Sequence, residues 1–258
     1  MTKAIFFDID GTLLSFETHA MSSATLDALH QLRSKGIKLF LSTGRHRSMI
    51  QSVLDLFPFD GCITLNGQYC FCKDQILRSV PMNRDDVTYL VELTRKNAFP
   101  CIFLEAEASY INCITPEMDV FPQQLSIPLP PLADPQRALE HPLYQVVAFL
   151  TKEKEHILTG HTKHLNPMRW HPDFIDVVAQ GGGKDRGMDA ILAHFKIPLE
   201  NTMAFGDGEN DLSMLRHAAV GVAMGNANPT VKAAADYVTA SVDEDGVVRA
   251  LEHFNLLL

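Results

Sequence analysis

Residues 4–13 read AIFFDIDGTL, a run of four apolar residues followed by Asp8, Asp10 and Gly11. A short apolar run that ends in acids and glycine is typical of a fully buried strand in a parallel sheet. Two carboxylates at the end of such a strand are costly unless a cation or hydrogen-bond donors face them. Because ligands bind at the carboxyl ends of strands in open α/β sheets, this stretch predicts a functional acidic pair. Taken alone, it leaves open an ordinary turn built from Asp and Gly.

The surrounding segments alternate between helix and strand patterns. Ser22 or Ser23 can cap a helix that Gly36 closes, residues 37–41 form a second buried strand, and a helix pattern runs through 49–54. The alternation returns near the C-terminus, with helices expected at 184–195 and 211–217, strands at 202–205, 220–223 and 237–239, a helix capped by Asn228-Pro229 and a last helix opened by Asp243. This order predicts an α/β fold with a doubly wound, mostly parallel, Rossmann-like sheet.

The middle of the chain has a different pattern. Strands are expected at 61–71 and 75–80, and strand-like runs at 101–104, 110–114, 144–150 and 174–178 then mix with helices, while prolines crowd between 116 and 142. We therefore predict a discontinuous core domain, residues 1–80 and 181–258, with an α+β cap domain inserted at 81–180.

Composition limits the classes of partner. The chain has 258 residues and a formal net charge of −9, without a Lys/Arg cluster, which argues against nucleic acid and anionic membranes as partners. Acids interrupt the first apolar run well before the length of a signal peptide or membrane span, so we expect a cytoplasmic protein. The five cysteines lack zinc-site spacing and are expected to be reduced. The sequence leaves the oligomeric state open, and a monomer is plausible.

Two further polar signals lie beside predicted elements. Residues 42–45 (STGR) follow the second strand, where the Thr43 hydroxyl and the backbone N–H groups around Gly44 can hold phosphate oxygens. Lys184 follows three glycines at a helix start and can neutralise a transferring phosphoryl group. A strand-to-helix turn and a solvated surface lysine are the respective alternatives when each signal is taken alone.

Residues 206–211 (GDGEND) give a third signal, after the strand that begins near Thr202. Asp207 is a hard oxygen ligand suited to magnesium, Asn210 can hydrogen-bond a phosphate, and Asp211 fits a place behind the ligands. A glycine-rich acidic turn is the alternative. All these signals are expected on the same side of one sheet, and this convergence favours a functional site.

The order of these motifs resembles the haloacid dehalogenase superfamily. It runs Asp-x-Asp-Gly-Thr, Thr-Gly-Arg, Lys, and Gly-Asp-x-x-Asn-Asp. The chain between Asp10 and Thr43 is too short for a cap, whereas the stretch from Thr43 to Lys184 has ample room for one. That spacing is similar to the Cof-type group with a type IIB cap, and Asn66-Gly67 and residues 174–176 fit the same group. The chain departs from many relatives in having Asp185-Arg186 between Lys184 and Gly187.

The resemblance implies a magnesium-dependent phosphatase of small phosphate monoesters, with sugar phosphates as the expected substrates. Asp8 would be the nucleophile that forms an aspartyl phosphate, and Asp10 the general acid and then the general base. The metal ligands would be Asp8, Asp207 and the backbone carbonyl of Asp10. The phosphate would be held by Thr43, Gly44, Lys184 and Asn210. A hexose phosphomutase and a catalytically silent sugar-phosphate-binding regulator are the alternatives.

Substrate specificity would come from the cap and the core residues that face it. The candidates are Arg45, Asn66, Arg169, Trp170 and His171. Packing or an exposed surface position is an equally good interpretation of Arg169, Trp170 and His171.

Overall fold

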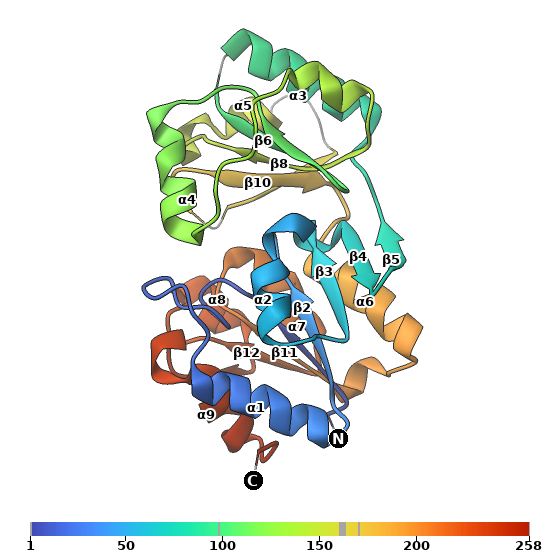
Figure 1. Ribbon diagram of the computed structural model, residues 1–258, viewed down its shortest axis with the longest axis vertical. Coiled ribbons are helices and arrows are strands. Elements are labelled where there is room, and N and C mark those ends of the chain that lie inside the picture. Colours follow the sequence, from blue (N-terminus) through green and yellow to red (C-terminus); the bar gives the residue numbers. More distant parts are fainter. Residues whose placement is uncertain (1, 98, 160–163, 170, 258) are drawn as a thin grey trace.

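The computed structural model describes residues 2–97, 99–159, 164–169 and 171–257, and it contains two separate sheets (Figure 1). The core sheet has eight strands in the order β13-β12-β11-β1-β2-β3-β4-β5, and the cap sheet has five in the order β7-β6-β8-β10-β9. No helix within these described ranges combines the length and apolar character needed to cross a membrane.

The apolar run at residues 4–7 forms the central strand of the core sheet. Strand β1 (Ala4–Phe7) pairs in parallel with β2 (Lys38–Ser42) on one side and with β11 (Thr202–Gly206) on the other. Parallel pairing continues outward to β3 (Gly61–Thr64) on the first side, and to β12 (Val220–Ala223) and β13 (Tyr237–Val238) on the second. The chain winds outward from β1 in both directions, which confirms the predicted doubly wound α/β fold.

Helices cover both faces of the core sheet. The apolar side chains on one face, such as Ile5 and Phe7, pack with α1 (Ser23–Ser34), α2 (Gln51–Leu56) and α9 (Gly246–His253). The alternate side chains, such as Ala4 and Phe6, pack with α6 (Lys184–Phe195), α7 (Leu212–His217) and α8 (Pro229–Ala234) on the other face. Because successive residues of a strand point to opposite faces, a strand buried on both must be apolar throughout.

The single strand expected at 61–71 is wrong. The chain turns at Leu65–Gly67, where Leu65 and Asn66 both have φ near +52° and Gly67 has φ of +89°. A left-handed turn of this kind favours Asn-Gly and reverses the strand direction. The turn separates β3 from the antiparallel β4 (Tyr69–Cys72), which in turn pairs with β5 (Gln75–Ser79).

The cap sheet is antiparallel throughout. It consists of β6 (Cys101–Glu105), β7 (Ser109–Ile111), β8 (Leu143–Ala148), β9 (Leu165–Met168) and β10 (Ile175–Ala179). Helices α3 (Arg84–Asn97) and α5 (His156–Thr159) lie on its outer side in Figure 1, whereas α4 (Val120–Leu125) packs on the side that faces the core.

Smaller corrections have local causes. Strand β9 was not predicted, because Pro167 within a short half-polar run hides an edge strand. The strand expected at 110–114 ends at Ile111. Asp243 lies in a short 3₁₀ turn capped by Ser241, and the last helix begins only at Gly246, after a left-handed residue, Asp245.

Gly67 should be less replaceable than Gly36, although both have positive φ. A Cβ atom on Gly67 would overlap the Gly183 carbonyl, whereas one on Gly36 would meet nothing within 4 Å. We expect Gly36→Ala to lower the free energy of unfolding by about 1–2 kcal/mol, because a residue with a Cβ atom is disfavoured by this amount in the left-handed conformation. Gly67→Ala should cost clearly more, because backbone must also move. Urea unfolding of both variants tests this, and equal losses would contradict it.

Candidate active site

Three charged side chains meet beyond the end of β1. Asp8 directly follows the strand, and Lys184, the first residue of α6, donates from Nζ to its Oδ1 at 2.6 Å. The same Nζ lies 2.5 Å from Oδ1 of Asp211, and the Lys184 side chain is completely buried. The structure therefore brings Lys184 to Asp8 despite the unusual Asp185-Arg186 that follows it.

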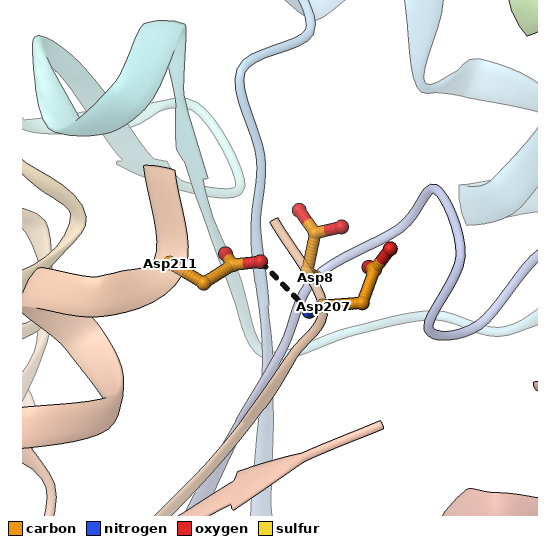
Figure 2. Close-up of side chains that lie close together, drawn as sticks. All are labelled: Asp8, Asp207 and Asp211. Atoms are coloured by element: carbon orange, nitrogen blue, oxygen red, sulfur yellow. Dashed lines mark hydrogen bonds between the residues drawn. The ribbon is translucent and has the colours of Figure 1, made fainter. Parts of the chain in front are cut away.

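Asp207 stands beside this group, at the end of β11. Thr12 donates to its Oδ1 at 3.0 Å and the amide of Asn226 to its Oδ2 at 3.2 Å. Figure 2 shows the Asp8 and Asp207 carboxylates side by side, while Asp211 reaches toward the backbone nitrogen of Asp207. Oδ2 of Asp211 accepts from this N–H at 3.0 Å and from that of Gly208 at 2.9 Å. Asp211 thus fixes the turn that carries Asp207.

The carboxylates form a cluster suited to a divalent cation. One oxygen from each of Asp8, Asp207 and Asp211 lies within 4.8 Å of the others. The Asp211 side chain is completely buried, whereas those of Asp8 and Asp207 are partly accessible, so Asp8 and Asp207 are the better ligands. Magnesium binds a few carboxylate oxygens in this manner and completes its octahedron with waters or substrate oxygens.

The electrostatics of the cluster support this fit. Burial, and then the charges of Asp211 and Asp10, raise the pKa of Asp8 to about 7, against the opposing effect of Lys184. Burial and the neighbouring Asp8 and Asp211 also raise the pKa of Asp207 well above its ordinary value. Burial alone would lower the pKa of Lys184, but the Asp211 and Asp8 carboxylates raise it instead. A cation between Asp8 and Asp207 would offset the repulsion that one lysine leaves uncompensated.

Asp10 pairs with an arginine and is not a member of this cluster. Its Oδ1 accepts from Nη2 of Arg45 at 2.6 Å and its Oδ2 from Nε at 2.8 Å. Arg45, expected to face the substrate, thus contacts a predicted catalytic residue. The Asp10 side chain is outside the carboxylate cluster, and only its backbone carbonyl remains as the predicted metal ligand.

The predicted phosphate-binding residues adjoin the same place. The Thr43 hydroxyl accepts from the Arg45 backbone N–H at 3.1 Å, and the Gly44 carbonyl accepts from the amide of Gln145 in the cap sheet at 3.1 Å. Asn210 donates to Oδ1 of Asn66 at 3.0 Å.

Asn66 joins the core to the cap. Its Nδ2 donates to Gln145 at 3.0 Å and to the buried Asp176 at 2.7 Å. Both partners belong to cap strands, β8 and β10 respectively. Asn66 is itself fully buried, so this contact supports the arrangement of core and cap rather than a direct contact with substrate.

Comparison with known proteins identifies the family. The sequence model of the haloacid dehalogenase-like hydrolases matches residues 5–251, nearly the whole chain. The chain belongs to this family.

Individual relatives of this haloacid dehalogenase-like hydrolase are phosphatases. The structure of the subclass IIB sugar phosphatase BT4131 has 42% sequence identity and a TM-score of 0.94, covering 99% of this chain and 100% of that one. The Bacillus subtilis 5-amino-6-(5-phospho-D-ribitylamino)uracil phosphatase YcsE is 28% identical over 98% of this chain and 96% of its own. The Escherichia coli pyridoxal phosphate phosphatase YbhA is 28% identical over 96% and 97%, respectively. The chain is accordingly a subclass IIB phosphatase, a phosphoric monoester hydrolase.

A pocket of about 560 Å³ separates the core from the cap in this hydrolase. Core residues at its wall include Asp8, Asp10, Thr43, Gly44, Asp207 and Asn210. The cap contributes apolar side chains, among them Leu104, Phe121 and Val147, together with Gln124, Lys152 and Glu155. Lys184 lies behind this wall and reaches the pocket through Asp8.

The predicted cap candidates differ in what they contact. Arg169 donates to Glu155 at 3.1 Å and to the backbone carbonyls of Leu150, His171, Pro172 and Phe174, so its guanidinium holds the cap loops together. His171 lines the pocket while its ring stacks on Phe174 with centroids 4.4 Å apart. Trp170 lies outside the described residues.

Sequence reasoning missed three residues that shape the site. Thr12 was part of the first motif and could have been noticed there, as could Asn226, which follows the strand at 220–223 next to a glycine. Gln145 lies inside a cap strand, and its sequence context carries no signal for a contact with Gly44.

Mg²⁺ affinity should depend on pH. Below about pH 7, Asp8 holds a proton that the cation must displace. The Mg²⁺ affinity should therefore fall about tenfold for each pH unit by which the pH is lowered, for each proton released. Calorimetric Mg²⁺ titrations between pH 6 and pH 8 measure this. The dependence should be shallower in Asp8→Asn. A wild-type affinity that stays constant over this range would contradict the predicted protonation of Asp8.

Proposed function

We propose that this chain is a Mg²⁺-dependent phosphatase that hydrolyses small phosphate monoesters, with sugar phosphates as substrates, through a phosphorylated Asp8. The observation that carries the proposal is the position of Asp8. It lines the pocket, contacts Lys184 at 2.6 Å and lies beside Asp207. A carboxylate with a fixed cation behind it and a second carboxylate beside it can both attack phosphorus and share a divalent ion.

The reaction divides into two displacements. An oxygen of Asp8 attacks phosphorus in line, the bond to the leaving oxygen breaks, and that oxygen takes a proton from Asp10. Asp10 then takes a proton from water as the water oxygen attacks phosphorus, which releases phosphate and regenerates Asp8. Thr43, the N–H groups near Gly44, and Asn210 hold the phosphoryl oxygens, and Lys184 fixes the charge and direction of Asp8.

Magnesium fits the oxygen donors at Asp8 and Asp207 and the predicted backbone carbonyl of Asp10. When bound, it would neutralise the charge that otherwise repels the phosphate from these carboxylates.

The substrate class rests on the pocket and the relatives together. A volume of about 560 Å³ accommodates a phosphate with a small organic group. The polar side chains Gln124, Lys152 and Glu155 can bind hydroxyls, which supports a sugar. The named relatives act on a sugar phosphate, a ribitylaminouracil phosphate and pyridoxal phosphate, so the assay must span these chemistries. We propose residues 81–180 as the cap that sets this choice.

Asp8→Asn should abolish phosphate release from every substrate, because the amide cannot act as the nucleophile. The measurement is phosphate liberated from a panel of sugar phosphates, nucleotides and pyridoxal phosphate. Asp27→Asn, on the exposed side of α1, is the matched control and should retain full activity. Thermal unfolding of both variants verifies that the fold is intact. Unchanged turnover by Asp8→Asn would falsify the covalent route, and isomerisation of a hexose phosphate without free phosphate would indicate a mutase.

Removal of divalent cations should stop turnover. Dialysis against a chelator is expected to reduce phosphate release by several orders of magnitude, and added Mg²⁺ should restore it. Asp207→Asn should shift the Mg²⁺ concentration for half-maximal activity upward, because one charged ligand is lost. Full activity in the chelated protein would remove Asp207 from its proposed role.

A further inference from the structure

Arg45 grips both oxygens of Asp10. The two N–H···O distances, 2.8 Å from Nε and 2.6 Å from Nη2, form a fork in which guanidinium and carboxylate match in geometry. The side chains are 7% and 17% exposed, so water competes little for either partner. Such a pair restricts the rotation of the carboxyl group about its bond to Cβ.

Arg45 is itself fixed from both sides. Its Nη1 donates to the Met49 carbonyl of the core at 3.0 Å, and Nη2 lies 3.4 Å from the Leu125 carbonyl of α4 in the cap. The backbone N–H of Arg45 donates to the Thr43 hydroxyl. The guanidinium therefore has a defined position when cap and core are together, and its hydrogen bonds orient the Asp10 carboxylate.

Proton transfer requires this pair to change. Asp10 accepts from Arg45 with both oxygens, so neither oxygen is placed to donate to a leaving group. One Asp10 oxygen must give up its hydrogen bond from Arg45 to carry the proton and face the substrate. The other oxygen can keep its hydrogen bond from Arg45. The retained Arg45–Asp10 hydrogen bond would keep the released oxygen directed toward phosphorus through both displacements.

We propose that Arg45 is a positioning residue for both proton transfers at Asp10. This inference rests on the proposed phosphatase reaction. In the first transfer the Asp10 proton passes to the leaving oxygen as its bond to phosphorus breaks and the Asp8–phosphorus bond forms. In the second, Asp10 regains a proton from the attacking water as the Asp8–phosphorus bond breaks. Arg45 gains and loses no proton in either.

Leaving-group dependence separates this role from substrate binding. p-Nitrophenolate leaves without a donated proton, whereas the alkoxide of a hexose 6-phosphate needs one. Loss of Asp10 orientation should therefore slow phosphoryl transfer from the hexose phosphate far more than transfer from p-nitrophenyl phosphate. A residue that only binds the sugar would instead raise KM for the hexose phosphate and leave later steps unchanged.

The experiment compares Arg45→Met, Asp10→Asn and the double variant by rapid quench, with enzyme in excess. In Arg45→Met we expect transfer from hexose 6-phosphate to fall on the order of 10²-fold or more, the usual size of acid–base catalysis. The single-turnover release of p-nitrophenol should slow less than tenfold, and hydrolysis of the aspartyl phosphate should slow with either substrate. The double variant should be no slower than Asp10→Asn, because both changes remove one function.

Two further variants support the interpretation. Arg47→Met is the matched control, since the Arg47 side chain is 38% exposed and its Nη1 lies 3.4 Å from an exposed Glu107. It should retain wild-type rates. Arg45→Lys keeps the buried charge without the fork and should fall between wild type and Arg45→Met for the hexose phosphate. This variant answers the question even if Arg45→Met unfolds.

Equal slowing for both leaving groups, a change confined to KM, or additive losses in the double variant would each overturn the role of Arg45. The proposed phosphatase reaction would survive these outcomes, because the wild-type protein would still form phosphorylated Asp8 and release phosphate. A wild-type protein that forms no phosphorylated Asp8 and releases no phosphate would overturn the reaction and this inference together.

Discussion

The crowding of carboxylates around one buried ammonium is the constraint on which this structure depends. Asp8, Asp207 and Asp211 come from both halves of the sequence and lie together, and Lys184 contacts Asp8 and Asp211. Unpaired charges in such a place would unfold a protein of ordinary stability, so the parallel strands that deliver them must be held by both apolar layers. Paired aromatic rings on each side of β1, Phe6 with Phe40 and Phe7 with Phe205, supply part of this packing. The proposed nucleophile, Asp8, thus directly follows a strand whose four side chains are completely buried.

The cap acts as the second wall of the pocket and also as part of its polar scaffold. Gln145 contacts Gly44 and Asn66, and Asp176 contacts Asn66, so the cap holds the loops that carry the proposed phosphate-binding residues. Asn66 has a left-handed backbone conformation at a tight turn, which directs its amide into this contact. Chemistry therefore belongs to the core, but the arrangement of its loops is shared with the cap.

The sequence was sufficient for the alternating core and for the residues at its strand ends, because both depend on local patterns. Buried parallel strands are apolar throughout, and acids that interrupt them are conspicuous. It was insufficient wherever partners come from distant parts of the fold. The pairing of Asp10 with Arg45 is an example, since Arg45 looked equally suited to a substrate. Edge strand β9 was hidden by its proline. The split of 61–71 depended on a turn at Asn66-Gly67, a pair that was used only for the family resemblance and not as a turn signal.

The central position of β1 has a consequence for the order of events during synthesis. One of its neighbours, β2, leaves the ribosome early, but the other, β11, begins only at Thr202. The core sheet therefore cannot be completed until about four-fifths of the chain has been synthesised. The strands of the cap sheet all lie between β2 and β11 in the sequence, so they are available to one another earlier. Antiparallel neighbours and a separate apolar cluster allow the inserted segment to condense first. In the nascent hydrolase the cap sheet would then form before the core sheet is complete.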